Sequence, residues 1–477
     1  MARELGIVVT PAEVQYEGLD VVLDNVAKRA GATRVSTTLG VFEPVADGDG
    51  QREPPLDVIG HGRILDRPLW GRRVLWTRSY LPSDPDPDVY AGSPYPPPKA
   101  APRPELRIDV PRLIIDGARA RGLGVSIRIS PYNLPSLPGG QTIHYGAGAD
   151  VSSDRPVRID GTVADSVLAG HGCLNNPNVR ALGRARMRDA LRRYPDVDTV
   201  YLDWAEYTPY FLEDVFTCFC PHCASAARAR VLGWERLTRA ARIAWDRLHA
   251  LTPADLALAS RAGPDDLARW IGAWSGLADW LSFKAVSVAA AAADLRATMD
   301  EAGCQNVALG LHGFPPPWSH VTGYEPAIVG RECQELAGKL FTFHWPMIVR
   351  WYAESILRWN PALGEADVIA AVRGALDLPS WSTEHRRSLA DYSMPLPDEP
   401  HLLTPEALTR KIDQLVALAR GSGAKVSAYL HSYRPADEWR QVLRAARASE
   451  ADAVWVQRYG YLSDEKLDII REEWGER

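Results

Sequence analysis

The feature that most constrains the fold is the regular alternation of short β-branched apolar runs with longer amphipathic stretches along the chain. This alternation is typical of βα units, in which parallel strands are joined by crossover helices. Eight strands joined in this way predict an α/β fold, a (β/α)8 TIM barrel that occupies residues 1–477 as a single domain. The predicted strands are 5–10, 34–41, 124–130, 199–204, 306–311, 339–344, 425–430 and 453–457.

Two doubly wound domains are the alternative to a barrel. That arrangement calls for a linker between the halves, and no stretch of the sequence divides it in this way. A nucleotide-binding fold of this kind would also carry a glycine-rich phosphate turn after its first strand, which the sequence lacks. The barrel is therefore the preferred prediction.

Two segments are too long for ordinary connections between strands and helices. Residues 44–107 are rich in proline and glycine and follow the second predicted strand, so we expect a loop insertion in the N-terminal half. We expect this insertion to form a lid or wall over the barrel mouth, with its proline-rich part at 82–104. Residues 224–302 are mostly helical in pattern and predict a helical insertion after strand four.

Composition and charge exclude several classes of function. The 54 lysines and arginines against 60 acidic residues give a net charge of −6, so we expect no binding of nucleic acid or of an anionic membrane. The sequence also contains no apolar run of membrane-spanning length and begins without a secretory signal pattern. We therefore expect a cytoplasmic protein, and a homo-oligomer stays open.

The residues that close the predicted strands are candidates for substrate contact, because active sites of β/α barrels lie at the C-terminal ends of the strands. Any one of them could instead be a packed rim residue, but together they are polar and aromatic on one rim. The candidates for substrate binding are Arg128, Asn133, Trp204, Tyr207, His312, His344, Trp345, His431, Tyr433, Arg458 and Tyr461.

A pair of carboxyl groups follows the clearest strand, in the segment VDTVYLDWAEY. Asp203 and Glu206 are three residues apart, so both can face the barrel mouth. A carboxylate that closes a buried apolar strand is costly unless it has a partner or a chemical role. Paired carboxyl groups are what glycoside hydrolysis requires. The alternative is that Asp203 caps a turn or holds Arg128, and that Glu206 alone is chemical.

A cysteine cluster is the most specific local motif. Cys218, Cys220 and Cys223 form a C-x-C-x-x-C pattern in which one loop can wrap a zinc ion, which normally takes four ligands. The expected fourth ligand is Cys173, with His222 as a second choice. Four protein ligands leave no open position, so the predicted zinc is structural. Free or redox-active cysteines are the alternative.

The strand that ends in a glutamate, followed within about a dozen residues by this cysteine pattern, resembles the β-galactosidases of glycoside hydrolase family 42. The resemblance covers residues 170–235, with VYLDWAEYTPYFLEDVFTCFCPHC and GCLNNPNVR matching the family arrangement. It implies a (β/α)8 barrel, a zinc held by Cys173 with the cysteine trio, and Glu206 at the position of the acid/base.

The chain also departs from that family. The family has Asn-Glu at the end of strand four, where this sequence has Ala205-Glu206, so the resemblance implies altered recognition of the sugar 2-hydroxyl. The family nucleophile is a glutamate at the end of strand seven, where this sequence has His431. In the part of the chain before strand seven, the nearest candidates for the missing carboxyl group are Glu384 and Asp391. We therefore expect a divergent relative.

The leading hypothesis is a glycosidase that acts on the O-glycosyl bond of a carbohydrate, with Glu206 as general acid/base. Asp203 or Glu384 would then be the second carboxyl group. One alternative is a metal-dependent hydrolase, isomerase or lyase, with a divalent ion bound by His312, His344 and His431 together with Asp203. The other alternative is a carbohydrate-binding barrel without catalytic activity.

Overall fold

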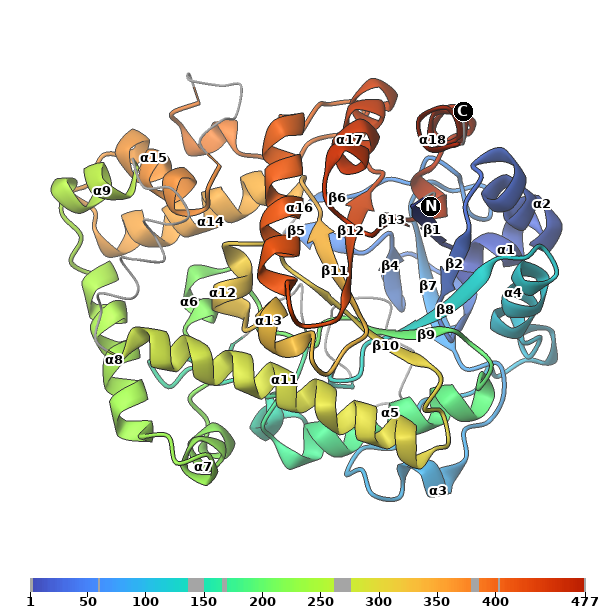
Figure 1. Cartoon of the computed structure of the whole chain (residues 1–477), viewed down its shortest axis with the longest axis horizontal. Helices are drawn as coiled ribbons and strands as arrows, with labels where there is room; N and C mark the ends of the chain where they lie inside the picture. The colour runs from blue at the N-terminus through green and yellow to red at the C-terminus, as the bar shows by residue number, and fades with distance from the viewer. Residues whose placement is uncertain are drawn as a thin grey trace.

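The computed structural model contains a closed barrel of eight parallel strands, which confirms the predicted α/β (β/α)8 fold (Figure 1). The structure describes residues 3–58, 61–135, 150–164, 170–260, 276–378, 386–401 and 404–475. Around the barrel the strand order is β1-β13-β12-β11-β10-β9-β8-β2. These strands are β1 (Glu4–Val8), β2 (Arg34–Thr37), β8 (Gly124–Ile129), β9 (Thr199–Leu202), β10 (Ala308–Gly313), β11 (Glu335–Leu340), β12 (Lys425–His431) and β13 (Ala453–Gln457).

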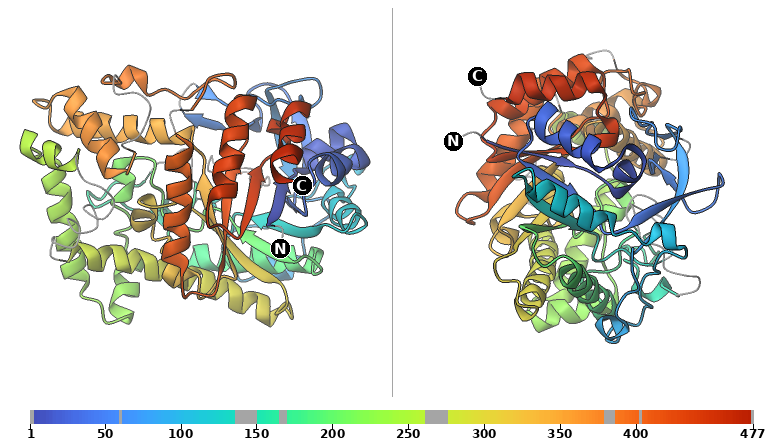
Figure 2. Two further views of the ribbon diagram at one scale, coloured as in Figure 1. Left: turned by 45° about the horizontal axis from the view of Figure 1, so that its top comes forward. Right: turned by 90° about the vertical axis from the view of Figure 1, so that its right-hand side faces the viewer.

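Helices cover the outside of the barrel (Figure 2), and several begin at side-chain caps that are readable in the sequence. Asp109 precedes α4 (Val110–Arg119) and accepts the Arg112 N–H at 3.0 Å. Asn176 and Ser463 cap α5 (Pro177–Arg193) and α18 (Asp464–Trp474) in the same way. Such caps satisfy backbone donors that a helix leaves open at its start. No helix in the described ranges has both the length and the apolar character needed to cross a bilayer.

Alternate side chains of the strands fill the barrel interior in layers. The middle layer consists of Val8, Tyr201, Ala337, Tyr429 and Trp455, all at most 1% exposed. These rings are large enough that neighbouring strands need glycine. A Cβ at Gly6 would lie 2.2 Å from the Trp455 ring, and one at Gly310 would lie 2.4 Å from the Tyr201 ring.

A buried ion pair lies below this layer, at the N-terminal end of the barrel. The guanidinium of Arg34 donates to both oxygens of Glu335 at 3.0 Å, and Thr199 donates to the same carboxylate at 3.0 Å. Tyr201 also hydrogen-bonds to Glu335. Burial is the largest effect and raises the pKa of Glu335, but the hydrogen bonds and charge of Arg34 and the hydrogen bonds from Tyr201 and Thr199 together outweigh burial and lower the pKa.

We expect Arg34→Met to destabilise the fold by about 3–5 kcal/mol, because it leaves the Glu335 carboxylate buried without its cation. The double variant Arg34→Met/Glu335→Leu should recover most of that loss, since both charges leave together. Chemical denaturation of the two variants measures the difference. Equal destabilisation of the single and double variants would contradict the prediction.

The boundary predicted for strand six was wrong. The expected strand was 339–344, but β11 is Glu335–Leu340, and His344 and Trp345 begin helix α14 (His344–Trp359). The apolar run around Phe341 and Phe343 suggested a strand there. The real strand begins at Glu335, a charged residue whose place inside the barrel depends on its pairing with Arg34, a distant residue.

The two long segments form additional structure at different places. Residues 44–107 contain most of an antiparallel sheet, β3-β7-β4, made of β3 (Val41–Val45), β7 (Leu75–Tyr80) and β4 (Gln51–Glu53). The helices α7 (Pro221–Ala229), α8 (Trp234–Leu248) and α9 (Pro253–Ala259) precede α11 (Leu277–Glu301), which packs beside α5 as a barrel helix (Figure 1).

The N-terminal insertion contacts the barrel at two levels. Its first part reaches the C-terminal ends of the last strands, because Glu53 pairs with Arg458 just after β13, and Arg63 Nη1 lies 2.7 Å from His431 Nε2. Its proline-rich part contacts the outer helix α5, where Tyr90 Oη donates to Asp189 at 3.2 Å. These contacts place residues 51–58 and 61–66, more than 82–104, beside the strand ends.

Candidate functional site

Polar side chains gather at the C-terminal ends of the strands, one step above the aromatic layer. Because side chains at alternate positions of a strand point the same way, Asp203, Lys339 and Gln457 face the barrel axis two residues beyond that layer. Arg128 joins them, since its Nη1 donates to Tyr429 Oη at 2.7 Å and to Gln457 Oε1 at 2.9 Å. The barrel mouth therefore carries Asp203 and Arg128, two candidates from the sequence, together with Lys339 and Gln457.

Asp203 and Glu206 are linked by a single ammonium group. Lys339 Nζ lies 3.1 Å from Asp203 Oδ1 and 3.5 Å from Glu206 Oε1, and the lysine side chain is 1% exposed. Arg128 Nε lies 4.0 Å from the other oxygen of Asp203. The Phe314 backbone N–H donates to Glu206 Oε2 at 3.2 Å. The structure therefore brings Asp203 and Glu206 together around Lys339.

The pKa values of the two carboxyl groups are shifted in opposite directions. Burial raises the pKa of Asp203, but Lys339 and Arg128 together outweigh burial and lower the pKa to about 2. Burial is also the largest effect on Glu206, and here it prevails over Lys339 and the Phe314 N–H, so the pKa of Glu206 is raised. Asp203 is thus ionised at neutral pH, while Glu206 binds a proton more readily than an ordinary glutamate. Two carboxyl groups whose pKa values are shifted apart in this way are suited to acid and base roles.

The turn between these carboxyl groups presents an aromatic side chain. Trp204 has φ +57, a left-handed conformation that is rare for residues other than glycine and that often occurs at functional sites. The Lys339 ammonium lies 4.2 Å from the centroid of the Trp204 ring. Trp204 and Phe341 are partly exposed, as are Asp203, Arg128 and Gln457. A ligand at the mouth therefore meets both flat apolar rings and hydrogen-bonding groups.

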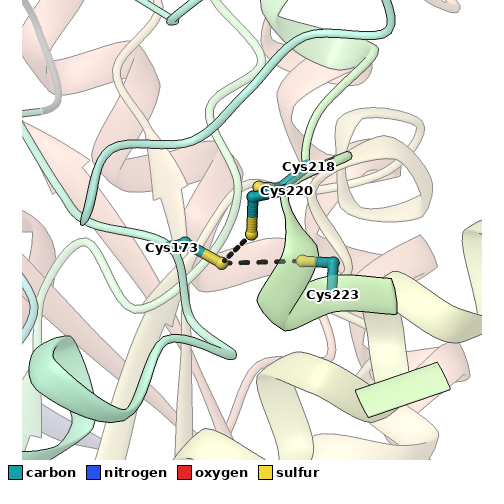
Figure 3. Close-up of side chains that lie close together, drawn as sticks. All are labelled: Cys173, Cys218, Cys220 and Cys223. Carbon is teal, nitrogen blue, oxygen red and sulfur yellow. Dashed lines mark hydrogen bonds between the residues drawn. The ribbon is translucent and has the colours of Figure 1, made fainter. Parts of the chain in front are cut away.

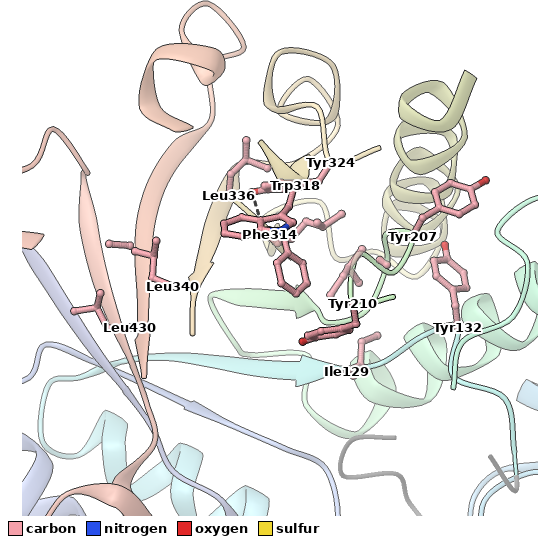
Figure 4. Close-up of a cluster of buried hydrophobic side chains, with 14 of the residues drawn as sticks. Ile129, Tyr132, Tyr207, Tyr210, Phe314, Trp318, Tyr324, Leu336, Leu340 and Leu430 are labelled. Atoms are coloured by element: carbon pink, nitrogen blue, oxygen red, sulfur yellow. Dashed lines mark hydrogen bonds between the residues drawn. The ribbon is translucent and has the colours of Figure 1, made fainter. Parts of the chain in front are cut away.

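Buried aromatic side chains support the loops after β9 and β10. Figure 4 shows Tyr207, Tyr210, Phe314 and Tyr324 among these side chains. Tyr210 packs edge-on against Phe314, with their ring centroids 5.4 Å apart. The backbone N–H of Tyr207 donates to Thr322 O at 2.9 Å and so ties the two loops together. This packing holds Glu206 between the two loops.

The three histidines of the metal hypothesis do not form a ligand set. His312 is stacked between the rings of Tyr201 and Tyr429, at 4.5 and 4.3 Å. His344 Nδ1 lies 3.3 Å from Tyr210 Oη, and His431 contacts Arg63. Among the described residues, the one group of three or more candidate metal ligands with atoms within 4.8 Å of one another consists of cysteines.

Most of the other predicted binding residues are buried within the rim. Trp345 is fully buried and packs on Trp318, with ring centroids 5.1 Å apart, so its surroundings are those of a core residue. Tyr461 lies against His431 at 4.8 Å. The remaining candidates Asn133, Tyr207, Tyr433 and Arg458 are at most 2% exposed. Glu384 lies outside the described residues.

Four buried cysteines lie together beside this site, as the sequence predicted. Cys173 Sγ lies 3.4 Å from Cys220 Sγ and 3.5 Å from Cys223 Sγ, and Cys218 completes the group (Figure 3). Four sulfur atoms that bind a tetrahedral zinc ion at about 2.3 Å lie about 3.8 Å from one another. The sulfur distances here are close to that value, so these residues fit a metal ion. His222, the second choice for the fourth ligand, is not part of the group.

Hydrogen-bond donors surround the cysteine sulfurs. The Val157 N–H donates to Cys218 Sγ and the Asn175 side chain donates to Cys223 Sγ, each at 3.4 Å. Hydrogen bonds to metal-bound thiolates orient these ligands in the same way. The buried ammonium of Lys284 lies 4.7 Å from the centroid of the Tyr207 ring and donates to Val215 O at 2.8 Å. Lys284 therefore links the backbone at Val215, three residues before Cys218, with the loop that carries Glu206.

Lys339 is the main site residue that sequence reasoning missed. Lysine is almost never fully buried unless it is paired, so a lysine within the apolar run GKLFTF was a readable signal. The wrong boundary for strand six placed Lys339 at the start of the predicted strand, at the end of the barrel away from the active site. In the structure it is the last but one residue of β11, at the mouth.

Comparison with known proteins identifies similar folds but no family. No protein-family model and no curated protein matches the sequence. A β-galactosidase from Marinomonas ef1 is 11% identical with a TM-score of 0.46, over 96% of this chain and 54% of that one. A β-galactosidase from Halorubrum lacusprofundi is 14% identical with a TM-score of 0.48, over 98% and 57%.

A third structure is similar in size to this chain. It is the PgaB glycoside hydrolase domain from Bordetella bronchiseptica, which is 10% identical with a TM-score of 0.47, over 98% of this chain and 99% of that domain. By contrast, this chain spans little more than half the length of the two β-galactosidases. At these identities the likeness concerns the barrel fold.

Proposed function

We propose that this protein is a glycoside hydrolase in which Glu206 donates a proton to the leaving-group oxygen. The observation that carries the proposal is the carboxyl pair after β9, with one group that tends to hold its proton and one that stays ionised. A general acid must be protonated at working pH, and a group that stabilises developing positive charge must be ionised. The pKa of Glu206 is shifted upward and that of Asp203 downward, which are the directions that these two roles need.

The surroundings of the pair suit a carbohydrate. Trp204 and Phe341 offer rings against which the apolar face of a sugar can pack, and Arg128 and Gln457 offer groups that hydrogen-bond to hydroxyls. We propose that these four residues contact the substrate. Sites for small polar ligands combine apolar walls with a few convergent polar groups in the same way.

The spacing of the pair bears on the stereochemical outcome. Since one ammonium nitrogen contacts both groups, at 3.1 and 3.5 Å, their nearest oxygens are no farther apart than the sum of these distances. Retaining enzymes place the carboxyl groups about 5–5.5 Å apart and inverting enzymes about 6.5–9.5 Å apart. With Asp203 as the second group, this upper limit is compatible with the retaining spacing. Glu384 is the other candidate for that role.

We also propose that Cys173, Cys218, Cys220 and Cys223 hold a structural zinc ion. Four thiolate ligands close the coordination sphere, so such an ion contributes folding energy and does not bind substrate. The proposal is supported by the sulfur spacing and by the donors from Val157 and Asn175.

A carbohydrate-binding barrel without catalysis is the second candidate. It is favoured by the burial of Glu206, which is 1% exposed. One oxygen of this carboxyl group accepts from Lys339, and the other accepts from the Phe314 N–H. The end of β12 is where the resemblance to family 42 calls for a nucleophilic glutamate. This chain has His431 there, which is fully buried and contacts Arg63.

A panel of 4-nitrophenyl glycosides and oligosaccharides distinguishes the two candidates. A hydrolase is expected to release 4-nitrophenol or new reducing ends from at least one compound, with activity that requires Glu206. A binding barrel is expected to give saturable calorimetric binding without hydrolysis, and Trp204→Ala should weaken that binding. A wild-type protein that neither binds nor cleaves any member of the panel contradicts both candidates.

A further inference from the structure

The position of Lys339 between two carboxyl groups of different exposure suggests a role that the proposed function does not include. Its ammonium contacts Asp203 at 3.1 Å and Glu206 at 3.5 Å, and its side chain is 1% exposed. The Asp203 side chain is 18% exposed, while that of Glu206 is 1% exposed. A lysine that is buried beside two carboxyl groups stabilises the ionised form of each, and it does so more strongly than a solvated lysine would.

Aromatic rings keep this ammonium in place. The Lys339 nitrogen lies 4.2 Å from the centroid of the Trp204 ring and 5.5 Å from that of Phe314. Cation–π contacts of this kind add to the attraction of the two carboxyl groups. The lysine therefore has a defined position, reached from β11, while both carboxyl groups come from the loop after β9.

We propose that Lys339 is a positioning residue that sets the protonation of the carboxyl pair, keeping Asp203 ionised beside the more deeply buried Glu206. Two carboxyl groups this close in a buried site would otherwise compete for a shared proton, as like charges do. The inference rests on the proposed function for its catalytic meaning, but its effect on protonation is independent of any substrate.

Other charged or titratable groups face the pair from each neighbouring element. Arg128 on β8 contacts Asp203 and also favours its ionised form. His312 on β10 has a pKa of about 3, lowered mainly by burial, and is neutral over the working range. Tyr429 on β12 and Tyr324 after β10 have raised pKa values, again mainly because of burial. Lys339 is thus the one cation among these groups that contacts both carboxyl groups.

The sign of the pH effect follows from these contacts. In the wild type the pKa of Asp203 is about 2, below the value of about 3.9 for an unfolded chain, so ionised Asp203 stabilises the fold above about pH 4. In Lys339→Met the burial remains, so we expect the pKa of Asp203 to rise above its unfolded value. The variant should then lose stability as pH rises from about 4 toward neutrality.

The experiment measures thermal unfolding of the full chain between about pH 4 and pH 8. We expect Lys339→Met to unfold at a lower temperature than the wild type, with a deficit that grows as pH rises. Each unit by which the Asp203 pKa rises corresponds to a tenfold change in the folded-to-unfolded ratio at neutral pH. Lys339→Arg keeps the cation and should show little growth of the deficit.

The double variant Asp203→Asn/Lys339→Met keeps the test decisive if the single variant does not fold. It removes the Asp203 carboxylate together with the cation and leaves Glu206, which lies farther from the ammonium, as the one carboxyl group of the pair, so it should fold and lose most of the growing deficit. A deficit of Lys339→Met that is constant with pH, or a double variant as unstable as the single one, would assign Lys339 a packing role and overturn the proposal. These outcomes need no substrate, so they are separate from failure of the proposed hydrolase function.

Discussion

Replacing Glu206 by glutamine is expected to lower kcat/KM on an alkyl glycoside by about 10²–10⁴-fold. An alkoxide leaves poorly unless its oxygen is protonated, and the glutamine amide cannot supply that proton. An aryl glycoside with an acidic phenol needs no proton for departure, so its rate of glycosidic cleavage should fall much less. The ratio of the two losses, measured on matched substrates, identifies the proton donor.

The control is Glu213→Gln, a glutamate on α6 (Leu212–Val215) that pairs with Arg358 on α14. It makes the same chemical change seven positions along the chain, outside the barrel mouth, and should leave the leaving-group dependence unchanged. If the enzyme retains configuration, azide should also yield a glycosyl azide with Glu206→Gln. Equal activity of Glu206→Gln and wild type on the alkyl glycoside would reject the assignment.

The pH profile gives the same assignment a second check. The pKa of Glu206 is raised by burial, so wild-type activity should fall as pH rises through that pKa and the general acid loses its proton. Asp203, with a pKa of about 2, stays ionised throughout, so its titration should not limit activity near neutral pH. In Glu206→Gln the alkaline decline on an aryl glycoside should disappear.

Replacing Cys218 or Cys220 by serine is expected to reduce zinc content and to destabilise the fold by several kcal/mol. A closed zinc site contributes its binding free energy to folding, which is on the order of 10–16 kcal/mol for small zinc peptides. Metal analysis of the purified protein and thermal unfolding measure the two effects. Chelation of the wild type should produce the same loss of stability.

Cys304→Ser is the matched control, since Cys304 is also buried but lies outside the cysteine group. It should keep its zinc and most of its stability. A wild-type protein purified without zinc, or a Cys218→Ser variant with full stability, would contradict the zinc proposal. Because Lys284 contacts both the Tyr207 ring and the backbone at Val215, three residues before Cys218, loss of the metal should also loosen the loop that carries Glu206.

Local patterns in the sequence were sufficient for the barrel and for the cysteine group. Hydrophobic periodicity marks strands and helices because one face of each element must be buried, and that requirement acts over a few neighbouring residues. The caps at Asp109, Asn176 and Ser463 are likewise local. The C-x-C-x-x-C spacing brings three thiols together within one loop, and only Cys173 had to be assigned from a distance.

Tertiary structure decided the parts that depend on pairing between distant residues. Glu335 begins β11 because Arg34, three hundred positions earlier, neutralises it inside the barrel, and a local pattern cannot reveal this partner. The strand was predicted four residues too late. The prediction therefore placed His344 and Trp345 at the rim and Lys339 at the opposite end of the barrel. The carboxyl pair after β9 was readable in the sequence, whereas the opposite pKa shifts of its two groups were not. They depend on how deeply each carboxyl group is buried and on a lysine from another strand, which only the folded barrel brings into contact with both.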